Sequence, residues 1–167
     1  PNALDISKFR PIAKAEAKKS IGVDSDSFSI LFNAYSLSEK RKGLDLLKET
    51  IELIIKEKMI PKEKLVLLVL GKGGQEIASA MDIRVKLLGR ISGDDNLAMC
   101  YNAADVFAAP SVQDNLPNTV MESLSCGTPA VAFNIGGMPD MINHKSNGYL
   151  ADPFSIEDFA KGISWIY

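Results

Sequence analysis

Residues 111–140, SVQDNLPNTVMESLSCGTPAVAFNIGGMPD, place a loop, a helix, a strand and a glycine turn in succession. Pro117 fits the opening of the helix, because it has no amide hydrogen to leave unpaired and its φ is already close to the helical value. Gly127 fits the end of the helix, where a positive φ is common, and Pro129 prevents the helix from continuing. The apolar run 130–133 is typical of a buried strand. The stretch therefore predicts one helix-to-strand unit of an α/β fold.

Two carboxylates lie on either side of the predicted helix start. Asp114 precedes it, and Glu122 follows eight positions later, inside the helix. The free N–H groups of a helix N-terminus bind anions, so an anion site between two acids would suit a charged sugar donor. The spacing alone leaves two other roles open, in which Asp114 caps the helix and Glu122 is a surface acid. If Glu122 is buried it needs a partner, because charged side chains are rarely buried unpaired.

The chain has 167 residues, which is enough for one globular domain with its own core. The net charge of −2 provides no basic field, so we expect no nucleic-acid partner and no attraction to an acidic membrane surface. No apolar run approaches the length of a membrane span, and no signal peptide is evident. We therefore expect a cytoplasmic location.

The cysteines and the histidine give no sign of a metal site. Cys100 and Cys126 lie in apolar segments, which predicts buried thiols in a reducing compartment rather than a disulfide framework or a zinc site. His144, the single histidine, lies in the polar turn NHKSNG and is expected to be exposed. Residues 71–74, GKGG, do not complete a dinucleotide-binding motif, and a tight turn between strand and helix is the better interpretation.

Short apolar runs alternate with segments of helical spacing along the whole chain. Strands are predicted at 28–33, 64–70, 84–88, 105–109, 130–133 and 149–150. Helices are predicted at 12–20, 44–58, 74–80, 94–103, from Pro117, near 138–142 and at 156–166, with an extended segment at 1–11 and a polar loop at 34–43. This alternation predicts an α/β fold with a Rossmann-like, doubly wound parallel sheet of about six strands flanked by helices.

Ligands of such sheets bind beyond the carboxyl ends of the strands. The loops that hold Lys42, Gly71, Gly89, Asp114 and Gly136 each follow a predicted strand. We therefore expect these loops to meet at one edge of the sheet.

Four segments together resemble a known family. They are PNALDISKFRP (1–11), RKGL (41–44), VKLLGRIS with YNAADVFAAPS (85–92 and 101–111), and the stretch 111–140. In order and spacing they resemble the C-terminal, donor-binding half of retaining glycosyltransferases of the GT-B fold, family 4, the group 1 glycosyltransferases. Ala3 stands where that family usually has glycine. The resemblance covers essentially all of residues 1–167, so we expect a single donor-binding domain, excised from an enzyme whose N-terminal acceptor domain is absent.

The resemblance implies roles for the two acids. Asp114 would contact the transferred sugar and act in catalysis, and Glu122 would contact the ribose of the nucleotide. The family usually has glutamate at the first of these positions. Asp114 keeps the charge but is shorter by one methylene, which affects the sugar that the site can hold.

The resemblance also implies a diphosphate at the start of the helix. Lys42, a second catalytic candidate, would neutralise charge on the leaving diphosphate, beside the N–H groups of Asn118 and Thr119. Asn115 and Leu116 would form the loop beside the sugar. The alternative for Lys42 is a solvated loop cation.

Two further loops would complete the donor site in this comparison. The backbone of Gly89, Arg90 and Ile91 would contact the base, and the loop of Gly137 would border the donor. An arginine that many family members carry after the first strand is missing, because Phe32-Asn33-Ala34 stand there. Its replacement among the nearby cations stays open, and the candidates are Lys40, Arg41 and Arg90.

We therefore expect a domain that binds a UDP- or GDP-linked sugar, in an enzyme that transfers the sugar to an acceptor hydroxyl with retention. The resemblance implies polysaccharide or glycolipid synthesis, no metal and no other cofactor. Membrane association, at the inner face, would come only through absent regions, and the fragment alone would be inactive. The alternatives are another GT-B activity, such as a nucleotide-sugar epimerase or a phosphorylase, and a non-catalytic nucleotide-binding module.

Overall fold

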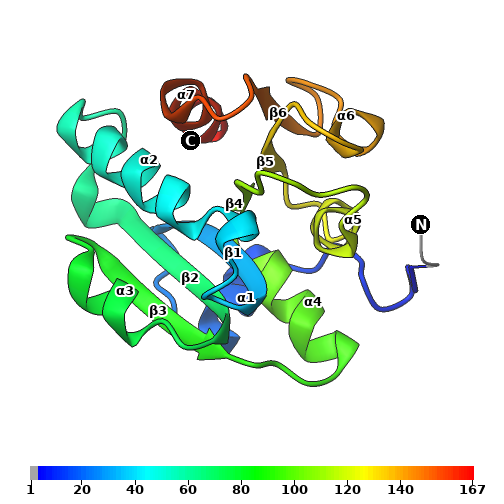
Figure 1. The fold of residues 1–167 in the computed structure, drawn as a ribbon. Coiled ribbons are helices and arrows are strands. Elements are labelled where there is room, and N and C mark those ends of the chain that lie inside the picture. Colours follow the sequence, from blue (N-terminus) through cyan, green and yellow to red (C-terminus); the bar gives the residue numbers. More distant parts are fainter. Residues whose placement is uncertain (1–3) are drawn as a thin grey trace.

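The computed structural model describes residues 4–167 and confirms the predicted α/β sheet (Figure 1). In this part of the chain six parallel strands form one sheet in the order β3-β2-β1-β4-β5-β6. The strands are β1 (Phe28–Ser36), β2 (Leu65–Lys72), β3 (Arg84–Gly89), β4 (Val106–Ala109), β5 (Ala130–Phe133) and β6 (Gly148–Ala151). The α-helices are α1 (Lys14–Ser20), α2 (Leu44–Lys56), α3 (Gln75–Ala80), α4 (Asp94–Ala103), α5 (Asn118–Ser125), α6 (Met138–Met141) and α7 (Ile156–Ile166), and 3₁₀ turns span Lys40–Lys42 and Lys62–Lys64.

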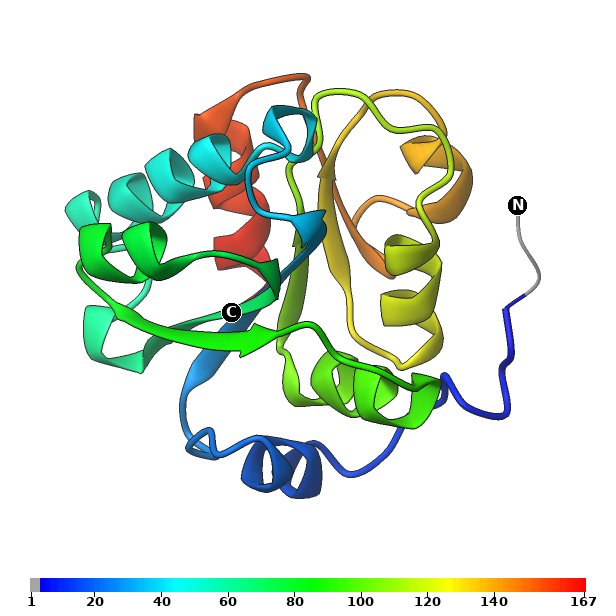
Figure 2. The same ribbon diagram turned by 60° about the horizontal axis from the view of Figure 1, so that its bottom comes forward.

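Helices cover both faces of the sheet, and Figure 2 shows α1, α4 and α5 on one side with α2 and α7 on the other. The central strands divide their side chains between the two cores. Leu65 and Leu67 of β2 lie in the core under α2 and α7, whereas Val66 and Leu68 lie in the core under α4 and α5. Because both faces are buried, β2 is apolar at successive positions rather than alternating with polar residues.

The order of the strands reverses between β1 and β4. The chain moves outward from β1 to β2 and β3, then returns through α4 to place β4 on the other side of β1. In parallel α/β sheets a crevice forms at this point, beyond the carboxyl ends of the strands. The loops after β1 and β4, which carry Lys42 and Asp114, therefore lie side by side.

The predicted boundaries differ from the structure by one or two residues in most elements and by more in two segments. Strand β1 continues through Ala34 to Ser36, because Ser36 pairs with Lys72 of β2, so the predicted polar loop 34–43 begins inside the strand. The predicted extended segment 1–11 contains a turn, in which the amides of Lys8 and Phe9 donate to the Asp5 carbonyl at 3.1 and 3.0 Å. Ala3, the departure from the family pattern, lies outside the described residues.

A buried ion-pair cluster ties the layers together at the opposite edge of the sheet. The Asp105 carboxylate, just before β4, accepts hydrogen bonds from Lys18 Nζ at 2.7 Å, Lys14 Nζ at 2.9 Å and the Ser29 amide at 2.8 Å. The side chain of Lys18 is only 3% exposed. Burial works to raise the pKa of Asp105, but the hydrogen bonds from Lys18, Ser29 and Lys14 outweigh it and hold the pKa below its ordinary value. The cluster thus joins α1 to β1 and β4.

Both cysteines are buried and free, as the sequence predicts. Burial raises the pKa of the Cys100 thiol, and burial with the nearby Glu122 charge raises that of Cys126, each to about 11. Among residues 4–167, no helix has the length and apolar character needed to span a membrane.

We predict that Asp105→Asn lowers stability and weakens its dependence on acid pH. The folded-state pKa of Asp105 is lowered, so its ion pairs stabilise the fold above the unfolded-state pKa of about 3.9 and are lost as pH falls through the lower folded value. At neutral pH the substitution leaves buried Lys18 without its carboxylate, which costs about 3 kcal/mol. Urea unfolding at neutral pH and at about pH 2.5 measures both effects.

The control is Asp24→Asn, which removes an exposed pair with Arg84 and should change stability far less. If the wild type and Asp105→Asn lost stability in parallel on acidification, the assignment of the acid dependence to Asp105 would be wrong.

Candidate functional site

The loop between β4 and α5, residues 110–117, is held by a glycine turn after β5. Gly136 and Gly137 approach this loop so closely that a Cβ at Gly136 would overlap the Asp114 carbonyl oxygen, and one at Gly137 would overlap the Asn115 carbonyl oxygen. Gly137 also lies against the side chain of Leu116. The two glycines therefore allow the backbone contact that fixes the position of Asp114.

The other side of the loop is held by the segment before α2. Gly43 has a φ of +72°, and a Cβ there would overlap the Pro110 carbonyl oxygen. Two residues away in each segment, the Val112 amide donates a hydrogen bond to the Arg41 carbonyl at 2.9 Å. The loops after β1 and β4 are thus joined through their backbones, which sets Lys42 beside Asp114.

Lys42 and Asp114 form a half-buried ion pair at the reversal point of the sheet. Lys42 Nζ lies 2.7 Å from Asp114 Oδ2, and their side chains are 16% and 13% exposed. Ser111 Oγ donates to the same carboxylate oxygen at 3.3 Å. Helix α5 starts after Pro117 with no side-chain cap, so the alternative that Asp114 caps this helix is wrong. Lys42 is likewise paired rather than a solvated loop cation.

The start of α5 offers unpaired backbone donors. The first amide to find an acceptor is that of Val120, which donates to the Pro117 carbonyl at 3.1 Å. The amides of Asn118 and Thr119 donate to no acceptor among residues 4–167. A small pocket lies in front of them, at the carboxyl ends of β1 and β4. It is lined by Phe32, Asn33, Lys42, Phe107, Ala108, Ala109, Pro110, Ser111, Asp114, Pro117 and Thr119.

A second pocket lies further along the same edge, over the ends of β1, β2 and β3. It is lined by Asn33, Ala34, Tyr35, Leu70, Gly71, Gly89, Arg90, Ile91 and Leu97. The Arg90 guanidinium lies over the ring of exposed Tyr35, 4.8 Å from its centroid. Asn33 lines both pockets, so the two adjoin at the end of β1.

Glu122 is half-buried in α5 and has the partner that its burial requires. The Tyr101 hydroxyl, from α4, donates to Glu122 Oε2 at 2.7 Å and accepts from Asn33 Nδ2 at 3.1 Å. Burial raises the pKa of the Glu122 carboxyl above its ordinary value, and the Tyr101 hydrogen bond offsets part of this rise. Glu122 lines neither pocket itself but is joined to the boundary between them through Tyr101.

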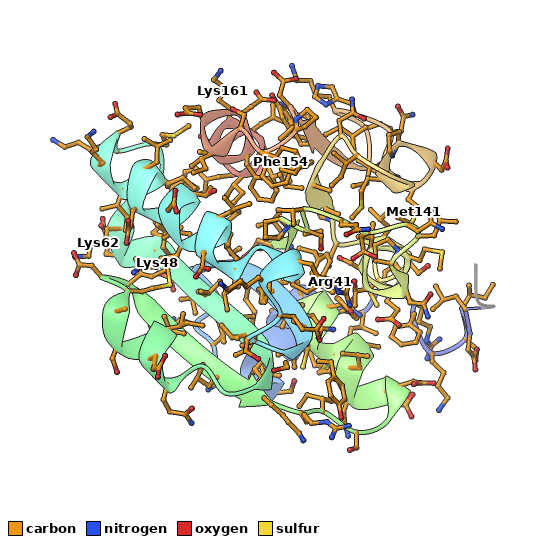
Figure 3. All side chains as sticks on the ribbon, in the orientation of Figure 1. Arg41, Lys48, Lys62, Met141, Phe154 and Lys161 are labelled. Atoms are coloured by element: carbon orange, nitrogen blue, oxygen red, sulfur yellow. The ribbon has the colours of Figure 1, made fainter. Side chains whose placement is uncertain are left out.

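Of the three cations considered as substitutes for the missing arginine, Arg41 lies nearest the ion pair. Its Nη1 is 4.0 Å from Asp114 Oδ2, while its Nη2 is 2.8 Å from Glu39. Figure 3 shows Arg41 between the start of α2 and α5, whereas Lys62 and Lys161 lie at the outer rim of that view. Arg90 is engaged with Tyr35 instead, and Lys40 is exposed.

The remaining sequence features are structural. Strand β2 continues through Gly71 and Lys72, so the predicted turn at 71–74 is confined to Gly73 and Gly74, which precede α3. His144 is exposed and accepts a hydrogen bond from the Leu150 amide at 3.1 Å. Across residues 4–167, no three His, Cys, Asp or Glu side chains gather in a way that could hold a metal ion. That the donor binds without a metal stays a prediction.

Sequence reasoning missed Tyr101 and Tyr35 as site residues. Tyr101 lies within the predicted helix 94–103, and the signal for its role is that a buried Glu122 needs a partner. Tyr35 fell in the segment predicted as a polar loop, where an aromatic residue gave no indication of its neighbour Arg90.

Comparison with known proteins identifies a family whose members this chain resembles. Residues 28–167 match the family model described as glycosyl transferases group 1. D-inositol 3-phosphate glycosyltransferase of Saccharomonospora viridis is 29% identical over 96% of this chain and 39% of its own length. The chain therefore spans about two-fifths of the length of this curated relative.

Solved structures share the fold. Sucrose-phosphate synthase of Thermosynechococcus elongatus matches with a TM-score of 0.83 at 23% identity, over 99% of this chain and 42% of that one. Anabaena HepE in complex with UDP-glucose matches with a TM-score of 0.78 at 22% identity, over 98% of this chain and 46% of that one. The α/β architecture is thus that of glycosyltransferases of the GT-B fold.

We predict that Gly43→Ala destabilises the protein by about 3 kcal/mol, because it adds an overlap with Pro110 to the cost of a left-handed φ. Gly22→Ala is the matched control. Gly22 has a similar φ of +64°, but a Cβ there would meet only the flexible end of Lys86. It should cost about 1 kcal/mol. Urea unfolding of both variants measures the difference, and equal losses would show that the loop moves aside without cost.

Proposed function

The chain belongs to the group 1 glycosyltransferases, and we propose that it is the donor-binding domain of an enzyme that transfers a sugar from a nucleoside diphosphate to an acceptor hydroxyl. One observation carries this proposal. Lys42 and Thr119 line one small pocket where the strand order reverses, and the amides of Thr119 and its neighbour Asn118 donate to no acceptor among residues 4–167. A cation beside a free helix N-terminus is suited to a diphosphate.

The ion pair with Asp114 does not prevent Lys42 from binding phosphate. A lysine ammonium has three donor hydrogens, and in the described residues only one acceptor, Asp114 Oδ2, is within hydrogen-bond distance of it. Lys42 can therefore keep this contact and still donate to a phosphate oxygen. In this arrangement it would neutralise charge that develops on the leaving diphosphate.

The loop beside the ion pair would hold the transferred sugar. This loop consists of Asp114, Asn115 and Leu116. Gly137 packs against its Asn115 carbonyl and Leu116 side chain. Asp114 would orient a sugar hydroxyl through a carboxylate oxygen. We infer transfer with retention, as in the family that the sequence resembles, by attack of the acceptor hydroxyl on the face of the sugar from which the diphosphate leaves, without a covalent sugar–enzyme intermediate.

The second pocket would hold the nucleoside. Its wall includes Gly89, Arg90 and Ile91, whose backbone would contact the base, and Glu122 would contact the ribose. The Anabaena protein HepE was solved with UDP-glucose, which supports a nucleotide sugar as the donor. We propose a UDP- or GDP-linked sugar, used in polysaccharide or glycolipid synthesis. The acceptor would bind to an N-terminal domain of the same enzyme, consistent with the greater length of the curated relative.

Calorimetric titration of the intact protein with UDP, GDP and ADP tests the donor site. We expect at least one of these diphosphates to bind at micromolar to millimolar concentration, and the matching nucleoside to bind more weakly. If none of the three bound at millimolar concentration, the proposed donor site would be wrong.

Incubation with the matching nucleotide sugars separates the rival activities. A glycosyltransferase releases the nucleoside diphosphate when an acceptor is supplied, whereas an epimerase would change the sugar without any acceptor. A non-catalytic module would bind the nucleotide and leave the sugar intact under both conditions.

We predict that Lys42→Ala weakens nucleoside diphosphate binding about tenfold, or about 1.4 kcal/mol, and leaves binding of the free nucleoside unchanged. The neighbouring Lys40→Ala is the control, because Lys40 is exposed in the same 3₁₀ turn and does not line the pocket. In the intact enzyme, Lys42→Ala and Glu122→Ala should each lower activity at least tenfold, about 1.4 kcal/mol of activation free energy. Near-wild-type rates in both variants would exclude the assigned roles.

A further inference from the structure

The fully buried Tyr101 donates a hydrogen bond to the Glu122 side chain. Tyr101 is 0% exposed, and its ring packs edge-on against Phe9 and Phe107, with centroids 6.3 and 5.6 Å apart. Its own backbone carbonyl accepts a hydrogen bond from Thr128 Oγ1 at 2.7 Å. Ring and backbone are therefore both fixed, and the hydroxyl reaches Glu122 from a rigid support.

The two hydrogen bonds point the same way: Asn33 donates to Tyr101, and Tyr101 donates to Glu122. Burial and the Glu122 charge raise the pKa of Tyr101 well above its ordinary value, so its hydroxyl stays protonated. An ionised carboxylate only accepts, so the hydroxyl hydrogen points to Glu122 Oε2. The Tyr101 oxygen is then left to accept from Asn33 Nδ2, which is the bond observed.

One oxygen of Glu122 is used and the other is available. Oε2 accepts from Tyr101, while Oε1 accepts from no donor within residues 4–167. A carboxylate fixed through one oxygen loses little conformational freedom when the other binds a ligand. Asn33, at the far end of the chain of contacts, stands where the two pockets adjoin.

We propose that Asn33 and Tyr101 are positioning residues that hold Glu122 for a ribose hydroxyl, so that the site selects ribonucleotides over deoxyribonucleotides. This inference rests on the proposed function, because it takes Glu122 as the ribose contact. These hydrogen bonds link Asn33 of β1 to Tyr101 of α4 and Glu122 of α5. The three side chains are therefore fixed relative to one another. Neither positioning residue needs to touch the ribose itself.

The test compares ribose and deoxyribose ligands in the intact protein. The ligands are whichever of UDP, GDP and ADP binds most tightly and its 2′-deoxy and 3′-deoxy counterparts, titrated by calorimetry. We expect the wild type to bind the ribonucleotide at least tenfold more tightly than one of the deoxy forms. Tyr101→Phe keeps the ring and removes only the hydroxyl, and it should reduce this preference to threefold or less while deoxynucleotide binding stays near the wild-type value.

Tyr149→Phe is the matched control. The Tyr149 hydroxyl also donates to a carboxylate, that of Asp158 at 3.1 Å, but from β6 and in the core on the other face of the sheet. Its removal should leave the ribose preference unchanged. Asn33→Ala serves as a second variant in case Tyr101→Phe does not fold, and it should reduce the preference in part, because the Tyr101 hydroxyl loses the donor that orients it.

The possible outcomes distinguish failure of the positioning role from failure of the proposed donor-binding function. A wild type that binds none of the nucleotides overturns both. A wild type that binds them without any ribose preference overturns the Glu122 assignment and the inference with it. A wild type that prefers ribose, with folded Tyr101→Phe and Asn33→Ala variants that prefer it equally, overturns the positioning role alone.

Discussion

Three glycines without side chains determine where the site residues lie. The loop that carries Asp114 is pressed on one side against Gly136 and Gly137 and on the other against Gly43, in each case through a backbone carbonyl. Any Cβ at these positions would push the loop away. Because the closest of these contacts are to main-chain oxygens, they hold the loop backbone in place, and the Asp114 side chain lines the pocket. The sheet supplies the rest of the frame, since its strand order brings the loops after β1 and β4 together.

Within that frame, the short side chain at position 114 has a physical consequence. The carboxylate lies within 2.7 Å of Lys42 Nζ, so the two charges largely neutralise each other before any ligand arrives. A diphosphate entering the pocket would therefore meet the Lys42 donors and the helix amides without a fully exposed anion beside them. Arg41 lies 4.0 Å from the same oxygen and also pairs with Glu39 at 2.8 Å.

The sequence predicted the strands and the loops that follow them, because their signals are local. The apolar run of β2 indicates burial on both faces, and Pro117 and Gly127 indicate where α5 starts and ends. The length of β1 was not predictable, since Ser36 is a strand residue only through its pairing with Lys72. The bond between Tyr101 and Glu122 was equally hidden, because 21 residues separate them and only the packing of α4 beside α5 brings them together. Both contacts join residues that are distant in sequence, so no short segment of the chain indicates them.

The two buried thiols lie on either side of that same contact. Cys100 precedes Tyr101 in α4, and Cys126 follows the end of α5, with its thiol 3.9 Å from the Ala98 carbonyl of α4. With pKa values of about 11, neither forms an appreciable amount of the reactive thiolate at neutral pH while the helices stay packed. Alkylation of either thiol therefore requires a local opening that exposes the thiol to solvent. Its rate in the native protein reports on such openings, and a ligand that stabilises the folded state would slow it.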